Sequence, residues 1–205
     1  MRDYYKFSTL STLNGVHAVM TYFKPLTSEQ APEEAKKRLM SAEKANGFSS
    51  NLLGVLAYSP AALEMYQTVS EINSRSSLNV QEREVVQLVA ATDNGCTFCV
   101  AGHTALAKNK AKLASEIVQA LRDQAELPDA RLNALSTFAR QALLTKGAVD
   151  EQTTQAFFDA GFTEQNALDV LLGLSLATLC NYANSLARTE LNSQLNAYKW
   201  EAPNA

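Results

Sequence analysis

The sequence predicts an all-α protein built as a multi-helix bundle. Apolar residues recur three and four positions apart over segments of roughly 10 to 25 residues, while the alternating patterns typical of strands are scarce. Helix start and stop signals separate these segments. At 205 residues, the chain is long enough to bury a substantial core. We therefore expect one helical domain or two closely fused halves.

We expect the chain to divide into three regions: an N-terminal arm at 1–27, a helical domain at 28–190 and a C-terminal tail at 191–205. The arm is rich in aromatic residues, has weak periodicity and ends near Pro25, and its His17 is expected to be structural. The tail contains Tyr198 and Trp200, whose rings favour packing over exposure. Aromatic side chains at both ends favour burial against a partner subunit, so we expect a homo-oligomer.

The first two helices are expected at 32–45 and 60–74. Acidic residues occupy the first turn of the earlier helix, where they interact favourably with the helix dipole, and Gly47 follows its last turn. The later helix begins where Ser59 offers a capping hydroxyl and Pro60 takes the first helical position.

The next two helices are expected at 80–93 and from Cys96 to about Leu106. Asn79, with a glutamate three residues further on, resembles a capping box that opens the earlier helix. Gly95, preceded by an asparagine, breaks the apolar pattern between the two helices.

Four further helices are expected in the C-terminal half, at 115–125, 129–146, 151–160 and 163–188. Gly147 and Gly161 fit left-handed caps between them. The longest nearly apolar run, 167–180, is expected to be too short to cross a bilayer. Segments 88–107 and 168–187 resemble each other weakly and both end in Leu-Ala, which suggests a degenerate duplicated helical unit.

Charge and composition restrict the compartment and the partners. The formal net charge of −3 and a pI of about 5.5 argue against a nucleic-acid or anionic-membrane surface. The first residues lack a compact apolar block followed by a small-residue cleavage site, so we expect no signal peptide. A cytoplasmic protein with neither nucleic-acid nor membrane partners is expected. In that reducing compartment, neighbouring cysteines are catalytic, redox-sensing or metal-binding more often than structural.

Two of the three cysteines lie close together, in the stretch Cys96-Thr97-Phe98-Cys99-Val100-Ala101-Gly102-His103. In a helix this spacing places Cys96, Cys99 and His103 on one face. Helical Cα atoms three residues apart lie about 5 Å from each other, within the disulfide range of roughly 4.4 to 6.8 Å. The pattern indicates a redox site. Helix position alone favours Cys96 as the more acidic thiol, whereas Cys99 would need His103 as proton acceptor.

A carboxylate beside the imidazole would make it a better base. Glu84 is the candidate, because it lies on a segment that is apolar over most of its circumference. Partial burial there would raise the pKa of its carboxyl towards the range useful for proton relay. Glu82 is the competitor, although helix capping already gives it an ordinary role.

These residues resemble the signature of alkylhydroperoxidase D-like proteins, within the carboxymuconolactone decarboxylase superfamily. The match consists of Glu84, eleven intervening residues, Cys96, two residues, Cys99, three residues and His103. The resemblance extends from about residue 31 to 188, with supporting matches at Ala31-Pro32, Asn51-Leu52-Leu53 and Ser59-Pro60.

The resemblance implies an all-helical, oligomeric peroxidase of the alkylhydroperoxidase D-like fold that acts on hydrogen peroxide or organic hydroperoxides. Cys99 would match the peroxidatic thiol, Cys96 the resolving thiol, and Glu84 with His103 the proton relay. The partners would be a peroxide and a dithiol reductant, and no cofactor is implied. One departure is Phe98, which stands where the best-known branch has a second histidine. An aromatic there fits the broad peroxidase-related branch of the family.

Other interpretations of the motif stay open. In one interpretation, Cys96 and Cys99 are a pair of buried core thiols. The protein would then be a non-catalytic oligomeric packing module. A zinc site would need further ligands that the sequence does not offer, and Cys180, set in an apolar stripe, is expected to be a plain core thiol. The rival activities are a thiol–disulfide reductase or redox sensor and an acid–base enzyme of the carboxymuconolactone decarboxylase kind.

Overall fold

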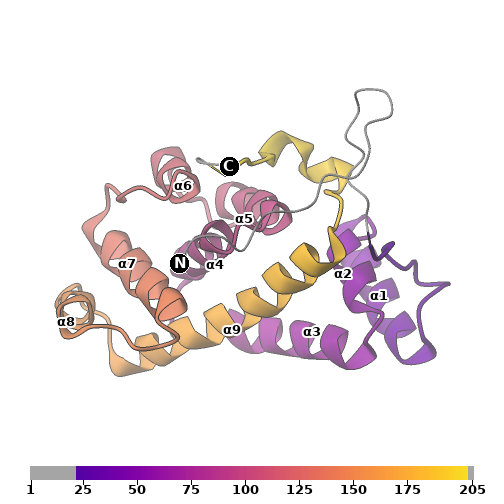
Figure 1. Ribbon diagram of the computed structural model, residues 1–205, viewed down its shortest axis with the longest axis horizontal. Helices are drawn as coiled ribbons and strands as arrows, with labels where there is room; N and C mark the ends of the chain where they lie inside the picture. The colour runs from indigo at the N-terminus through magenta and orange to yellow at the C-terminus, as the bar shows by residue number, and fades with distance from the viewer. Residues whose placement is uncertain (1–21, 203–205) are drawn as a thin grey trace, which may run out of the picture.

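The computed structural model describes residues 22–202 and shows an all-α architecture (Figure 1), as the sequence predicts. Within these residues the helices are α1 (Glu33–Asn46), α2 (Asn51–Leu56), α3 (Pro60–Ser74), α4 (Val80–Asp93), α5 (Thr97–Asn109), α6 (Ser115–Arg122), α7 (Ala130–Leu144), α8 (Glu151–Asp159), α9 (Glu164–Ala187) and the short 3-10 helix η1 (Ser193–Tyr198). The expected arm lies mostly outside the described residues, and His17 lies there too.

Helix α4 forms the centre of the fold. It packs against α5, α7 and α9, which surround it in Figure 1. Side chains from Val85 to Ala91 on this helix are almost all inaccessible to solvent, because the sequence there is apolar around the whole helix rather than along one stripe. The two ends of the molecule are formed by α1–α3 and by α6–α8, and α9 runs between them.

The local signals in the sequence act as expected. Asn79 accepts hydrogen bonds from backbone N–H groups of α4 while Glu82 accepts from the Asn79 N–H, which completes the capping box. Ser59 caps α3 through a hydrogen bond of 3.3 Å from the Ala62 N–H. Gly161 ends α8 with φ of +85°, a left-handed conformation that favours glycine.

Helix α2 was not among the expected helices. Its six residues are apolar or small apart from Asn51, and all but Asn51 are buried, so the segment has no polar face that would create a helical period. Gly54 lies where the chain at Leu26 crosses the helix, and a Cβ at this position would lie 2.7 Å from the Leu26 carbonyl oxygen. Glycine therefore permits the close contact.

The weak internal repeat does not correspond to a repeated structural unit. Residues 88–107 are divided between α4 and α5 by the turn at Gly95, whereas residues 168–187 lie within the single helix α9. The similarity of the two segments therefore reflects two buried apolar helices.

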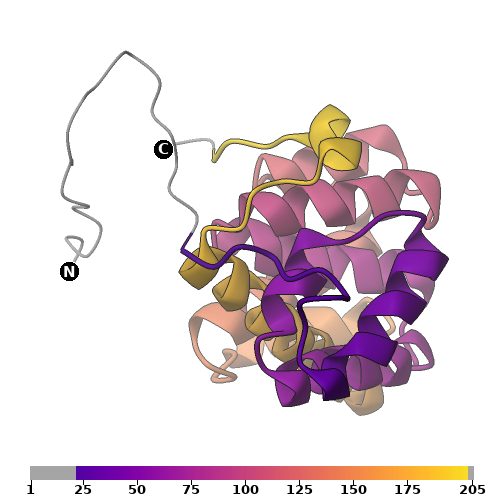
Figure 2. The ribbon, with the colours of Figure 1, turned by 90° about the vertical axis from the view of Figure 1, so that its right-hand side faces the viewer.

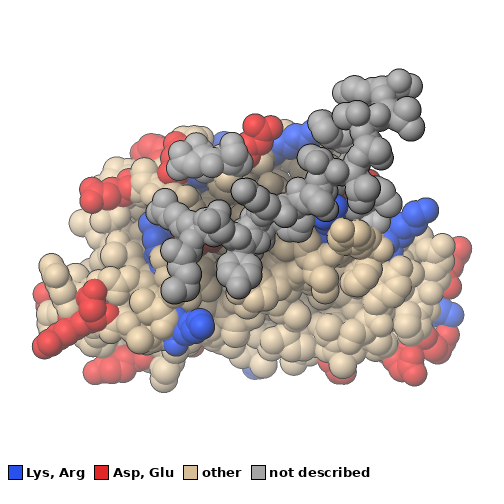
Figure 3. All heavy atoms as spheres, in the orientation of Figure 1, with Lys and Arg blue, Asp and Glu red and all other residues tan. Residues whose placement is uncertain are grey.

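Helix α9 is 24 residues long. The expectation that this segment is too short to cross a bilayer was drawn from residues 167–180 alone, and it is wrong because the helix extends beyond them at both ends. By length and composition it is the one described helix that could cross a membrane, although half of its most apolar window is buried inside the fold. Its outer side exposes apolar side chains: Leu168, Leu171, Tyr182 and Leu186. Figure 3 shows few charges along this side where grey atoms do not cover it. The homo-oligomer stays a prediction, which sedimentation equilibrium can test.

The C-terminal segment packs on the helices rather than projecting into solvent. Figure 2 shows it running over the outside of the bundle, and η1 contacts α5. The Trp200 side chain is 7% exposed, and its indole N–H donates to the Arg122 carbonyl at 2.9 Å. The Arg122 guanidinium in turn donates to the carbonyls of Tyr198 and Lys199. Arg122 therefore both accepts a hydrogen bond from the C-terminal segment and donates hydrogen bonds to it.

Candidate active site

The two neighbouring cysteines lie at the N-terminus of α5. Cys96 is the N-cap residue rather than part of the first turn, and its sulfur accepts a hydrogen bond of 3.3 Å from the Cys99 N–H. Both are free thiols, and they are 3% and 4% exposed. The cap geometry turns the Cys96 side chain back over the helix end, and this brings the two sulfur atoms together.

The two thiols have opposite acidity. A hydrogen bond from the Cys96 thiol to Cys99 is the largest cause that lowers the pKa of Cys99, from 9.0 to about 7, against the opposing effect of burial. The same hydrogen bond raises the pKa of Cys96, and burial adds to that rise. Cys99 is therefore the more acidic thiol, and about half of it is thiolate at pH 7. The argument from helix position, which favours Cys96, is wrong because the cap places Cys96 as donor to its neighbour.

Two asparagines of α9, which are not among the site residues predicted from the sequence, also contact the Cys99 sulfur. The Asn184 side-chain amide donates to the sulfur at 3.3 Å, and Asn181 lowers the pKa of Cys99 in the same direction. Asn181 is held by Asn94, whose amide donates to its carbonyl oxygen at 2.9 Å. Asparagines three residues apart on the buried side of an apolar helix were the available signal.

His103 and Glu84 form the expected pair. The His103 Nδ1 atom lies 2.9 Å from the Glu84 Oε2 atom, and the side chains are 27% and 14% exposed. Burial alone would lower the pKa of His103, but the charge and hydrogen bond of Glu84 and the nearby Cys99 outweigh it and raise this pKa. With Nδ1 facing a carboxylate, Nε2 is the atom left to exchange a proton.

The competing carboxylate has a structural role. Glu82 accepts from the Asn79 N–H in the capping box and pairs with Arg131 at 3.1 Å. The Arg131 guanidinium also donates to the Ala160 carbonyl and lies 3.7 Å from the centre of the Phe162 ring. Glu82 thus links α4 to α7 and α8, away from the thiols.

A cavity of about 530 Å³ lies over Cys99 and His103, and we call it the substrate cavity. Apolar side chains from five segments form much of its wall: Phe48, Leu52, Phe98, Leu106, Leu176 and Leu195. Cys180 lies in the wall too, so it is a buried thiol of the site and not only of the core. Tyr66 also lines the cavity, and burial is the main cause that raises the pKa of its hydroxyl, which therefore stays protonated.

Other features of the described residues bear less on this chemistry. A depression of about 590 Å³ between α1 and α3 is lined by residues such as Lys37 and Gln67 and by none of the candidate site residues. Within residues 22–202, no group of three or more His, Cys, Asp or Glu side chains is placed to hold a metal ion.

Comparison with known proteins finds one family model that matches the part of the chain containing this geometry. Residues 60–141 match the model of the carboxymuconolactone decarboxylase family, a segment that spans α3 to most of α7 and contains all four candidate residues. No curated protein matches the chain.

Solved structures with the same fold come from peroxidase-related proteins and a debrominase. An uncharacterized peroxidase-related protein from Ralstonia eutropha JMP134, with an alkylhydroperoxidase AhpD core, superposes with a TM-score of 0.75 at 20% identity, covering 85% of this chain and 94% of the other. One from Silicibacter sp. TM1040 gives 0.72 at 19% identity, covering 85% and 93%. The debrominase Bmp8 in complex with 2,3,4-tribromopyrrole gives 0.71 at 14% identity, covering 88% and 96%. At these identities the similarity shows a shared fold.

Proposed function

We propose that the protein is a thiol-dependent peroxidase, because residues 60–141 match the carboxymuconolactone decarboxylase family model and the chain shares its fold with a protein that has an alkylhydroperoxidase AhpD core. The substrate would be hydrogen peroxide or an organic hydroperoxide, reduced through a disulfide between Cys96 and Cys99. The observation that carries the proposal is the lowered pKa of Cys99, about 7, beside a second thiol and a carboxylate-backed imidazole.

In the first step, the Cys99 thiolate attacks the terminal oxygen of the hydroperoxide. An S–O bond forms, the O–O bond breaks, and the leaving alkoxide takes a proton from the His103 imidazolium. The products are the Cys99 sulfenic acid and an alcohol, or water when the substrate is hydrogen peroxide. Glu84 holds His103 in position and favours its protonated form, so acid and nucleophile exist together near neutral pH.

In the second step, the Cys96 sulfur attacks the sulfenic sulfur. An S–S bond forms, the S–O bond breaks, and hydroxide leaves as water with the proton of the Cys96 thiol. The hydrogen bond between the two thiols supports this step because it already places the attacking sulfur beside its target. A dithiol then reduces the disulfide by two exchange reactions and leaves as a cyclic or protein disulfide. We also propose a cytoplasmic location, where such dithiols are abundant.

The proposal is tested by peroxide consumption with dithiothreitol as reductant. Cys99→Ser should abolish turnover, and Cys96→Ser should give a single equivalent of sulfenic acid without recycling. Cys180→Ser is the matched control, because it removes the third thiol of the cavity and should keep turnover. Full peroxide consumption by the Cys99→Ser variant would overturn the proposal.

The same proteins separate the rival activities. A thiol–disulfide reductase or redox sensor would exchange with a partner dithiol while leaving peroxide untouched. An acid–base enzyme of the decarboxylase kind would keep its activity after both Cys96 and Cys99 are changed to alanine. A packing module would leave both thiols resistant to labelling in the native protein.

A further inference from the structure

We infer that the dithiol reductant reaches the disulfide at Cys96, through a second cavity separated by Phe98 from the cavity in which peroxide meets Cys99. This inference depends on the proposed peroxidase function and adds the route and chemical class of the reductant. The second cavity, which we call the reductant cavity, has a volume of about 480 Å³ and has Cys96 in its wall.

The two cavities lie at different ends of the α5–α9 pair. Along α5, residues 95–98 line the reductant cavity, whereas residues 98–110 contribute to the substrate cavity. Along α9, the reductant cavity is lined by Asn184, Ser185 and Arg188 and the substrate cavity by Leu176 and Cys180. Cys96 thus lines the reductant cavity and not the substrate cavity, and the reverse holds for Cys99.

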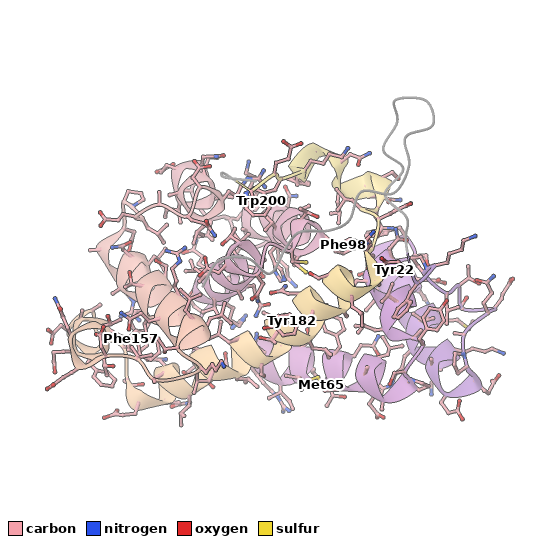
Figure 4. The ribbon with its side chains drawn as sticks, viewed as in Figure 1. Tyr22, Met65, Phe98, Phe157, Tyr182 and Trp200 are labelled. Carbon is pink, nitrogen blue, oxygen red and sulfur yellow. The ribbon has the colours of Figure 1, made fainter. Side chains whose placement is uncertain are left out.

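Phe98 forms the partition. Among the described residues it is the one side chain that lines both cavities, and it is 7% exposed. In Figure 4 it lies near the C-terminal part of α9, on the side where the C-terminal segment returns. A ring at the position between the cysteines blocks direct passage from one cavity to the other. This gives a physical role to the residue that departs from the best-known branch of the family.

Two residues of the reductant-cavity wall carry buried polar atoms that lack partners. The Asn184 carbonyl oxygen and the Thr189 hydroxyl are buried, and neither has a hydrogen-bond partner among residues 22–202. A buried polar atom without a partner costs free energy unless something binds it. Asn184 is 4% exposed and its amide already donates to Cys99, so its carbonyl is held in a fixed direction.

Charged and polar groups surround these atoms. Lys199, Arg188 and Glu190 contribute to the same wall, together with the exposed Thr97 and Ser185. The substrate cavity has a larger apolar wall, which suits the organic part of a hydroperoxide. The reductant cavity suits a polar dithiol whose hydroxyl or amide groups would pair with the polar side chains of its own wall.

The chemistry of exchange favours attack at Cys96. The reductant thiolate would form an S–S bond with the Cys96 sulfur while the Cys96–Cys99 bond breaks, and Cys99 would leave as thiolate. Exchange is faster when the leaving thiol is more acidic, and the pKa of Cys99 is lowered to about 7. The second thiol of the reductant then attacks its own sulfur in the mixed disulfide and releases the Cys96 thiol. Both active-site thiols are regenerated and the dithiol is oxidised.

The test blocks each cavity in turn. Ser185→Trp places a large ring in the reductant cavity, and Leu106→Trp places one in the substrate cavity; both positions are exposed, so the fold should tolerate either change. Single-turnover oxidation by peroxide and reduction of the disulfide by dithiothreitol are followed separately by alkylation and mass analysis. Ser185→Trp should slow reduction about tenfold and leave oxidation unchanged, and Leu106→Trp should do the reverse, because exchange depends on access to the attacked sulfur.

Two outcomes would overturn the inference. Both half-reactions could slow together in either variant, which would mean one shared entrance. Alternatively, a mixed disulfide trapped with a monothiol could map to Cys99 instead of Cys96. The disulfide for these reductions is made with diamide, so failure of peroxide to oxidise the thiols would count against the peroxidase function alone.

Discussion

The hydrogen bond from Cys96 to Cys99 can be tested by two variants that differ in one donor. Cys96→Ala removes the donor, and Cys96→Ser replaces it with a hydroxyl. Neither variant can close the disulfide, so each gives one equivalent of sulfenic acid on Cys99. We expect the apparent pKa of Cys99 to stay near 7 in Cys96→Ser and to rise in Cys96→Ala, because this hydrogen bond is the largest cause that lowers it.

The size of the effect follows from the lowered pKa. If the pKa of Cys99 returned fully from about 7 to 9.0, the thiolate would lose about 3 kcal/mol of stabilisation relative to the thiol. At pH 7 the thiolate fraction would fall from about one half to about one hundredth. The more basic thiolate is the better nucleophile, by about eightfold for two pKa units, so the net loss of rate at pH 7 is about sixfold. Asn184 and His103 also lower this pKa, so a smaller shift is expected in practice.

The assay is the single-turnover rate of sulfenic acid formation between about pH 5.5 and 10, a range that contains the inflections expected for both variants, with the product trapped by dimedone. The Cys96→Ala curve should rise later and then exceed the Cys96→Ser curve at high pH, so the two should cross. Identical inflection points in the two variants would refute the hydrogen bond as the main cause of the acidity.

Three other variants test other contacts. Glu84→Gln should lower the pKa of His103, move the high-pH limb of peroxide turnover to lower pH and reduce kcat about tenfold or more; an unchanged pH profile would contradict this. Asn184→Ala should shift the inflection of thiol alkylation to higher pH, and an unmoved inflection would remove this residue from the site. Arg131→Met leaves the buried Glu82 without its charge partner, and urea unfolding should show a loss of about 1 to 3 kcal/mol while turnover per folded molecule stays the same. Equal stability would show that the pair contributes nothing.

Much of the fold is determined by signals that act locally. The capping box at Asn79, the Ser59-Pro60 start of α3 and the glycine after α8 were each identified from a few neighbouring residues and are confirmed. Helix α2 was missed because burial on all sides removes the alternation of polar and apolar residues on which a prediction depends.

The candidate site also has one part that local spacing predicts and another that it does not. The structure brings Cys96, Cys99, His103 and Glu84 together, and three of these lie within eight residues, so helix geometry alone groups them. Their catalytic roles stay a proposal. The contact of Asn184 with Cys99 joins residues 85 positions apart, which tertiary packing sets and local spacing cannot predict.

The sequence also does not predict which of the two thiols, Cys96 or Cys99, has the lower pKa. The order of acidity depends on whether Cys96 lies in the first turn of α5 or caps it, a difference of one residue at a helix boundary. As a cap, Cys96 donates a hydrogen bond to Cys99 and becomes the less acidic thiol.

The proposed disulfide between Cys96 and Cys99 is tested most directly by mass analysis of the intact protein before and after one equivalent of peroxide, followed by digestion with trypsin. We predict a loss of two hydrogens, located within the single peptide from Glu84 to Lys108 that contains both Cys96 and Cys99, with Cys180 unchanged in a separate peptide. An unaltered mass, or a cross-link that joins Cys180 to either of the other cysteines, would contradict it.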